Sequence, residues 1–114
     1  MESILTSTKK LSGVLKEYEH FDDDIIMYIN SVFMVLKQCG VGPSEGFIIT
    51  DESATWRDFI PNDNDMALRE SVKTYMGAKV RLQFDPPTNG SHLEALQRTI
   101  DEFEWRLYIE ADPI

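Results

Sequence analysis

Apolar side chains recur at helical spacing in three long stretches of the chain, at about residues 23–38, 65–84 and 92–110. A period near 3.6 residues gathers such side chains on one face of a helix, and that face then packs on a core. Gly40 follows the first stretch and Pro86 follows the second, and both residue types end helices. The pattern therefore predicts three long helices.

Two further segments have weaker patterns. Residues 3–15 predict a short lead helix that is interrupted at Gly13. Residues 46–60 do not follow the helical period. The β-branched residues at the start of this stretch predict an extended piece, and the mixed pattern after them predicts one helical turn and an exposed loop. We therefore expect one all-α domain over residues 1–114, built from four helices with a short extended or irregular segment around 46–60.

Polar residues at two helix starts predict capping. Asp22, Asp23 and Asp24 stand at the entry of the 23–38 helix, where carboxylates cap free amide groups and complement the positive end of the helix dipole. A magnesium site is a poor alternative, because consecutive helical residues point about 100° apart. Ser91 and Glu94 have the spacing of a capping box for the last helix.

Four large apolar side chains fall on helix faces that lie opposite the predicted core. Trp105 and Ile109 do so on the last helix, and Met27 and Met34 do so on the 23–38 helix. One interpretation is a central 23–38 helix that packs on two sides, and the other is a subunit interface. Both interpretations stay open, and they are compatible with each other.

The last two helices carry opposite net charges. Residues 65–84 hold four basic and two acidic residues, a net charge of +2, whereas residues 91–114 hold two basic and six acidic residues, a net charge of −4. Opposite charges on different elements suit a head-to-tail contact between copies, which can close into a ring. We therefore expect the protomer interface to combine Met27, Met34, Trp105 and Ile109 with the basic residues Arg69, Lys73 and Arg81.

Composition narrows the function classes. A net charge of −9 repels a phosphate backbone, which disfavours a role in gripping nucleic acid or an anionic membrane. A single cysteine, Cys39, cannot form an internal disulfide. No stretch approaches 18 consecutive apolar residues, and the first residues lack the pattern of a signal peptide, so we expect no membrane partner.

Catalytic chemistry finds little support in the sequence. Glu94, Asp101 and Glu104 can line one flank of the last helix, like the carboxylate rows of all-helical nucleotide pyrophosphatases, but a second helix has no matching row. His20 and His92 have no spacing that pairs them with a nucleophile. The glycines lack the pattern of a phosphate-binding loop. We expect no enzyme activity, no cofactor and no metal site.

Five segments of the chain resemble the head–tail connector (head completion or adaptor) proteins of tailed bacteriophages and prophages. They are residues 21–33, 49–56, 72–75, 80–87 and 100–107. The most specific are Arg81-Leu-Gln-Phe-Asp-Pro-Pro87 and Asp101-Glu-Phe-Glu-Trp-Arg106. The resemblance covers nearly the whole chain, and its motifs are structural rather than catalytic.

The resemblance implies a small, mainly helical protein of the virion neck, present in the host cytoplasm during assembly. Such proteins form a ring below the portal protein, expected to be dodecameric in the virion, and they receive a stopper or tail-completion protein. Double-stranded DNA passes through the channel without specific binding. The resemblance also implies that the C-terminal segment docks on the portal. In this chain the segment comprises Tyr108, Ile109, Glu110, Ala111, Asp112, Pro113 and Ile114.

An acidic channel wall avoids holding DNA, because only lysine and arginine release counterions from phosphates. We therefore expect five acidic side chains to face the channel: Asp51, Glu52, Glu94, Asp101 and Glu104. The competing interpretation is an acidic, phage-encoded regulatory protein that binds and blocks another protein, such as a DNA-binding protein of the host or the phage.

Overall fold

The computed structural model describes residues 2–111 and contains no β-strand within them, which confirms the expected small all-α domain. The helical turn expected near residue 56 is a separate short helix. The elements are α1 (Ile4–Leu11), α2 (Asp22–Gln38), α3 (Trp56–Phe59), a 3₁₀ turn η1 (Asp63–Asp65), α4 (Met66–Phe84) and α5 (Gly90–Ala111).

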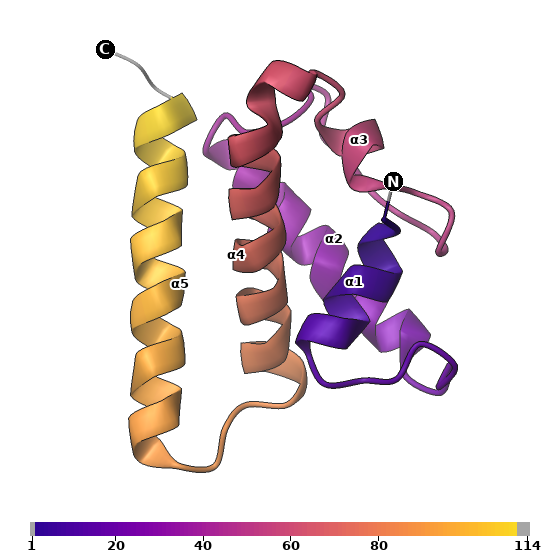
Figure 1. Cartoon of the computed structure of the whole chain (residues 1–114), viewed down its shortest axis with the longest axis vertical. Coiled ribbons are helices and arrows are strands. Elements are labelled where there is room, and N and C mark those ends of the chain that lie inside the picture. Colours follow the sequence, from indigo (N-terminus) through magenta and orange to yellow (C-terminus); the bar gives the residue numbers. More distant parts are fainter. Residues whose placement is uncertain (1, 112–114) are drawn as a thin grey trace.

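Helix α4 lies at the centre of the molecule. Helices α1, α2, α3 and α5 all pack against it, and α5 forms one edge of the molecule (Figure 1). The core is built from the apolar faces that the periodicity predicts. Its fully buried helical side chains include Ile25, Ile29, Val32, Phe33, Leu36, Val72, Tyr75, Met76, Val80, Ile100 and Leu107.

Helix α1 approaches α4 closely because residue 77 is glycine. A Cβ atom added to Gly77 would lie 2.7 Å from Leu11 Cδ1 and 2.8 Å from Leu11 Cβ. These distances are shorter than any ordinary carbon–carbon contact. A larger residue at position 77 must therefore push the two helices apart.

The lead helix is shorter than the sequence predicts, because the chain turns at Gly13, where φ is +83°. The loop that follows is held by Lys9, whose buried ammonium group donates to the carbonyl oxygens of Lys16 (3.0 Å) and Tyr18 (2.8 Å). The same Nζ atom lies 2.7 Å from Asp22 Oδ1. One buried cation thus ties the loop and the start of α2 to α1.

The extended segment before α3 is fixed to the core by side chains. Asn30 on α2 forms two hydrogen bonds with the backbone of Ile49, and Trp56 Nε1 donates to Ser7 Oγ over 2.8 Å. The rings of Phe33, Phe47, Trp56 and Phe59 pack as one aromatic cluster against α2. These contacts bury Ile49, Trp56 and Phe59, and so anchor the segment and α3 in the core.

Two capping expectations are wrong in detail. Residue 21 is the N-cap of α2 and makes no side-chain cap hydrogen bond, so the three aspartates act only as charges in the first turn. Helix α5 begins at Gly90 rather than after Ser91. Asn89 Oδ1 accepts hydrogen bonds from the backbone N–H groups of Ser91 (2.9 Å) and His92 (3.2 Å), because asparagine is as effective a cap as serine.

Candidate interaction surfaces

The outer face of α5 presents a patch of large apolar side chains. Trp105 is 64% exposed, and Tyr108 and Ile109 are about half exposed. Trp105 and Tyr108 also line a shallow groove of about 350 Å³ between α5 and Cys39 at the end of α2. Trp105 and Ile109 therefore face outward as the helical wheel predicts, while their role in an interface stays a prediction.

A second apolar patch lies on α2. Met27 and Met34 are exposed on its outer face, as predicted. Met34 also lines a groove of about 370 Å³ that separates α2 from residues 45–48 and that includes Phe47 and Ile48. The side chain of Ile48 is 69% exposed, and sequence reasoning missed it because the segment has no periodicity from which an outward face can be inferred.

A third apolar groove of about 540 Å³ was also missed. It lies between the loop after α1 and the end of α4, and Leu15, Tyr18, Phe21 and Phe84 line it. Leu15 is 73% exposed. The signal in the sequence is that three apolar residues, Val14, Leu15 and Tyr18, follow the glycine that ends the lead helix.

The three basic side chains that the sequence predicts at the protomer interface differ in their exposure and in their contacts within the chain. Arg69 is buried, and its Nη2 donates to Asp63 Oδ1 (3.0 Å) and to the carbonyl oxygen of Asn62 (3.4 Å). Lys73 forms an ion pair with Glu2. Arg81 is exposed. Only Arg81 of the three is a fully exposed cation, because the other two serve contacts within the chain.

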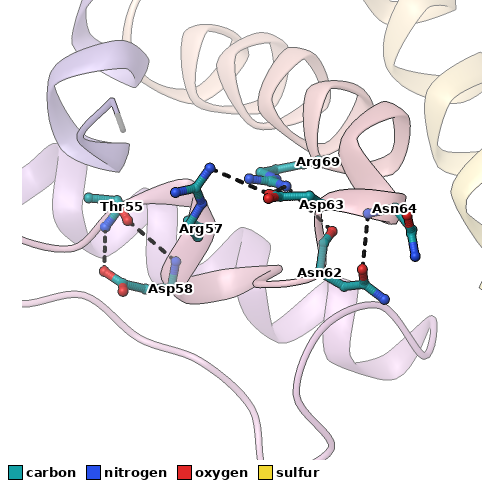
Figure 2. A network of polar contacts seen from close by, with 7 residues as sticks. All are labelled: Thr55, Arg57, Asp58, Asn62, Asp63, Asn64 and Arg69. Carbon is teal, nitrogen blue, oxygen red and sulfur yellow. Dashed lines mark hydrogen bonds and ion pairs between the residues drawn. The ribbon is translucent and has the colours of Figure 1, made fainter.

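Figure 2 shows how the buried arginine organises the connection between α3 and α4. Arg57 and Arg69 both point at Asp63, and their Nη2 atoms lie 3.4 Å and 3.0 Å from its Oδ1. The hydrogen bond from Arg69 and the charge of Arg57 hold the pKa of Asp63 below its usual value. At the start of α3, Thr55 and Asp58 form a true capping box. This region is structural, which explains why Arg69 is withdrawn from the surface.

The acidic residues that were predicted to face a channel fall into two groups. Asp51, Glu52, Glu94 and Asp101 are exposed. The backbone and hydroxyl of Ser53 donate to Asp51 Oδ1 and lower the pKa of that carboxyl. Whether these four face a channel stays a prediction.

Glu104 differs from the other four because it is half-buried and joins two helices. Its Oε2 accepts a hydrogen bond from the hydroxyl of Tyr75 on α4 over 2.7 Å. Burial, together with this hydrogen bond, raises the pKa of the Tyr75 phenol, which therefore stays a donor. Burial and the nearby charge of Glu104 also raise the pKa of the Cys39 thiol, so that the thiol is a poor nucleophile.

The described residues hold no group of three or more histidine, cysteine, aspartate or glutamate side chains suited to a metal ion. Within residues 2–111, no helix is long and apolar enough to cross a membrane. Part of the predicted portal contact cannot be placed: Asp112, Pro113 and Ile114 lie outside the described residues, as do the side chains of Glu110 and Ala111.

The chain as a whole is similar to a known protein family. A family model described as phage connector protein matches residues 4–113. Neither the curated proteins nor the solved structures that were compared with the chain gave a match. The match spans nearly the whole domain, including all five α-helices of the described residues. The chain therefore belongs to the phage connector protein family, and its role is to connect the head and tail of a phage virion by contacts with other head and tail proteins.

Proposed function

We propose that the protein is a structural, non-enzymatic adaptor that forms a ring below the portal protein. The ring extends the DNA channel and receives a stopper or tail-completion protein at its other end. The observation that carries this proposal is the pair of apolar patches on α5 and α2, which lie on different helices of one small domain. A monomer gains nothing by exposing Trp105 and Met34 to water.

Two different patches favour a head-to-tail contact over a symmetric dimer. In a head-to-tail contact one surface of each copy meets another surface of the next, and a suitable rotation closes the ring. The third groove, beside Leu15, remains free for a protein other than a second copy. The number of surfaces thus agrees with a subunit that has two identical neighbours and a further partner above or below.

The charge of the chain supports a channel that does not hold DNA. Exposed carboxylates such as Asp51, Glu52 and Glu94 repel the phosphate backbone, and the net charge of −9 adds to this repulsion at long range. We place these carboxylates on the channel side of the ring. Glu104 is left out of this set because it bonds Tyr75 within the chain.

The portal contact is assigned to the C-terminal end of α5 and the residues after it. Tyr108 and Ile109 are exposed in the last turns of this helix, at one edge of the molecule (Figure 1). Exposed side chains in the last turns of a helix at the edge of a domain can enter a groove on a partner without disturbing the core.

The test is co-assembly with the portal protein of the same phage. The chain and the portal are mixed, the mass of the complex is measured by light scattering, and the complex is imaged by electron microscopy. We expect a ring of this chain on one end of the portal, and Ile109→Asp abolishes it. Met66→Asp, at an exposed apolar position on α4, is the matched control and leaves the complex intact.

A wild-type chain that stays monomeric and does not bind the portal contradicts the proposal. If the same chain instead binds a DNA-binding protein of the host or the phage and blocks its contact with DNA, the protein is an acidic regulator.

A further inference from the structure

We infer that the indole of Trp105 in one copy inserts into the groove between α2 and residues 45–48 of the next copy. This inference rests on the proposed ring and identifies the contact that joins its subunits. The groove of each copy is thus occupied by a side chain of a second copy of the same chain.

The groove is preformed and apolar. Phe33, Met34, Phe47 and Ile48 line it, and its volume of about 370 Å³ is in the range of small binding pockets. The two hydrogen bonds between the Asn30 amide and the backbone of Ile49 hold its outer wall, and the rings of Phe33 and Phe47 pack edge to face with centroids 5.2 Å apart. Because the walls are already fixed, little ordering cost opposes the entry of a side chain.

Trp105 has the properties of an interface anchor. It is the more exposed of the two tryptophans, at 64% against 2% for Trp56. Large aromatic side chains that fill a pocket supply much of the binding energy of protein interfaces. Tyr108 and Ile109 follow it in the last turns of α5, at the end of the helix that is proposed to dock on the portal.

The positions of the two surfaces favour a second copy. Lys37 lines the groove, whereas Cys39, two residues later at the C-cap of α2, lies beside Trp105. Two residues of helix correspond to about 200° of rotation, so the groove and the indole lie on different sides of the same helix. A chain therefore cannot fill its own groove with Trp105, and it can use both surfaces at once with two neighbours.

Charge complements the apolar fit. The groove carries the ammonium group of Lys37, and Asp101 precedes Trp105 by one helical turn. Glu102 is already paired with Arg106, whereas Asp101 accepts a hydrogen bond from Gln97 over 3.2 Å and forms no ion pair within the described residues. Asp101 is therefore the carboxylate for Lys37. Glu45 also lines the groove, and Arg98, about one turn before Asp101, has the opposite charge to meet it.

A charge-reversal cycle on assembled rings tests the contact. Lys37→Glu and Asp101→Lys are each expected to weaken the association of copies on the portal about fivefold, and the double variant is expected to restore it. Lys10→Glu, at an exposed cation on α1 outside both surfaces, is the matched control. Thermal unfolding of each variant shows whether the monomer is still folded.

Tryptophan fluorescence gives a second measurement. In wild-type protein, assembly on the portal is expected to shift the emission of Trp105 to shorter wavelength as the indole leaves water. Ile48→Asp, which places a charge in the groove, is expected to abolish this shift. If rings form on the portal while the shift is absent and charge reversal has no effect, the inference is wrong and the ring stands. If wild-type protein forms no ring, the proposed function itself fails.

Discussion

The side-chain amide of Asn30 pairs with both backbone groups of Ile49. Its Oδ1 accepts the N–H of Ile49 over 2.8 Å, and its Nδ2 donates to the carbonyl oxygen of Ile49 over 3.0 Å. The amide therefore satisfies an extended residue as a neighbouring strand does in a sheet. A side chain of α2 thus supplies the hydrogen-bond partners that a neighbouring strand would otherwise provide.

Replacing Asn30 with aspartate tests this role, because Asn30→Asp retains an acceptor for the Ile49 N–H but loses the donor to its carbonyl oxygen. We expect the free energy of unfolding to fall by about 1–3 kcal/mol. Urea unfolding measures the loss, and Ser31→Ala, at the exposed neighbouring position, is expected to change stability by less than about 0.5 kcal/mol. Equal stabilities of the two variants are incompatible with this role.

The helices could be predicted from the sequence because their apolar residues follow one period and their ends carry glycine or proline. The outward faces of Met34 and Trp105 could be predicted for the same reason, since a position on a regular helix fixes the direction of its side chain. Both side chains are exposed, as the wheel indicates. Sequence pattern is therefore sufficient where geometry is periodic.

The remaining features depend on pairs of residues that no period connects. Arg69 is buried because Asp63, on a separate turn, accepts its hydrogen bond. Ile48 is exposed because its neighbour Ile49 is held by the amide of Asn30, which lies 19 residues earlier in the chain. Such contacts arise only once the helices have packed, so neither the buried arginine nor the grooves could be inferred from spacing.

Lys9 is expected to be one of the most sensitive polar positions in the domain. Lys9→Met removes the donor of the Lys16 and Tyr18 carbonyl oxygens and leaves Asp22 without its cation. We expect a loss of about 1.5–3 kcal/mol in the free energy of unfolding, and faster amide hydrogen exchange in residues 12–21. Lys10→Met, at the exposed neighbouring position, is the control. Unchanged exchange in the loop would show that Lys9 does not hold it.

Gly77→Ala is expected to destabilise the domain although alanine favours helices. The added methyl group overlaps Leu11, and overpacking costs about 1–3 kcal/mol, against a gain of at most about 1 kcal/mol in helix propensity. Gly90→Ala is the matched control, because a Cβ atom there meets nothing within 4 Å. Melting temperatures should fall for the first variant and stay equal or rise for the second. The reverse order would refute the close packing of α1 on α4.

The contact of Asp63 with Arg69 predicts a loss of stability in acid. Because this contact lowers the pKa of Asp63 in the folded state, its stabilising contribution is fully present above the ordinary aspartate pKa of about 3.9. It disappears as the pH falls through the lower folded-state value. We therefore expect wild type to exceed Asp63→Asn in stability at pH 6 and the difference to shrink toward pH 2. Glu52→Gln, at an exposed turn position, is the control for loss of a carboxylate elsewhere.

The two tryptophans are expected to separate folding from assembly. Trp56 is buried and its indole N–H donates to Ser7, so Trp56→Ala should cost about 3–5 kcal/mol in the free energy of unfolding. Trp105 is exposed in the monomer, so Trp105→Ala should leave the melting temperature nearly unchanged and should prevent rings from forming on the portal. Thermal unfolding and light scattering on the same samples measure both effects. If Trp105→Ala lowers the melting temperature as much as Trp56→Ala does, the indole of Trp105 stabilises the monomer and is not the anchor of the subunit contact.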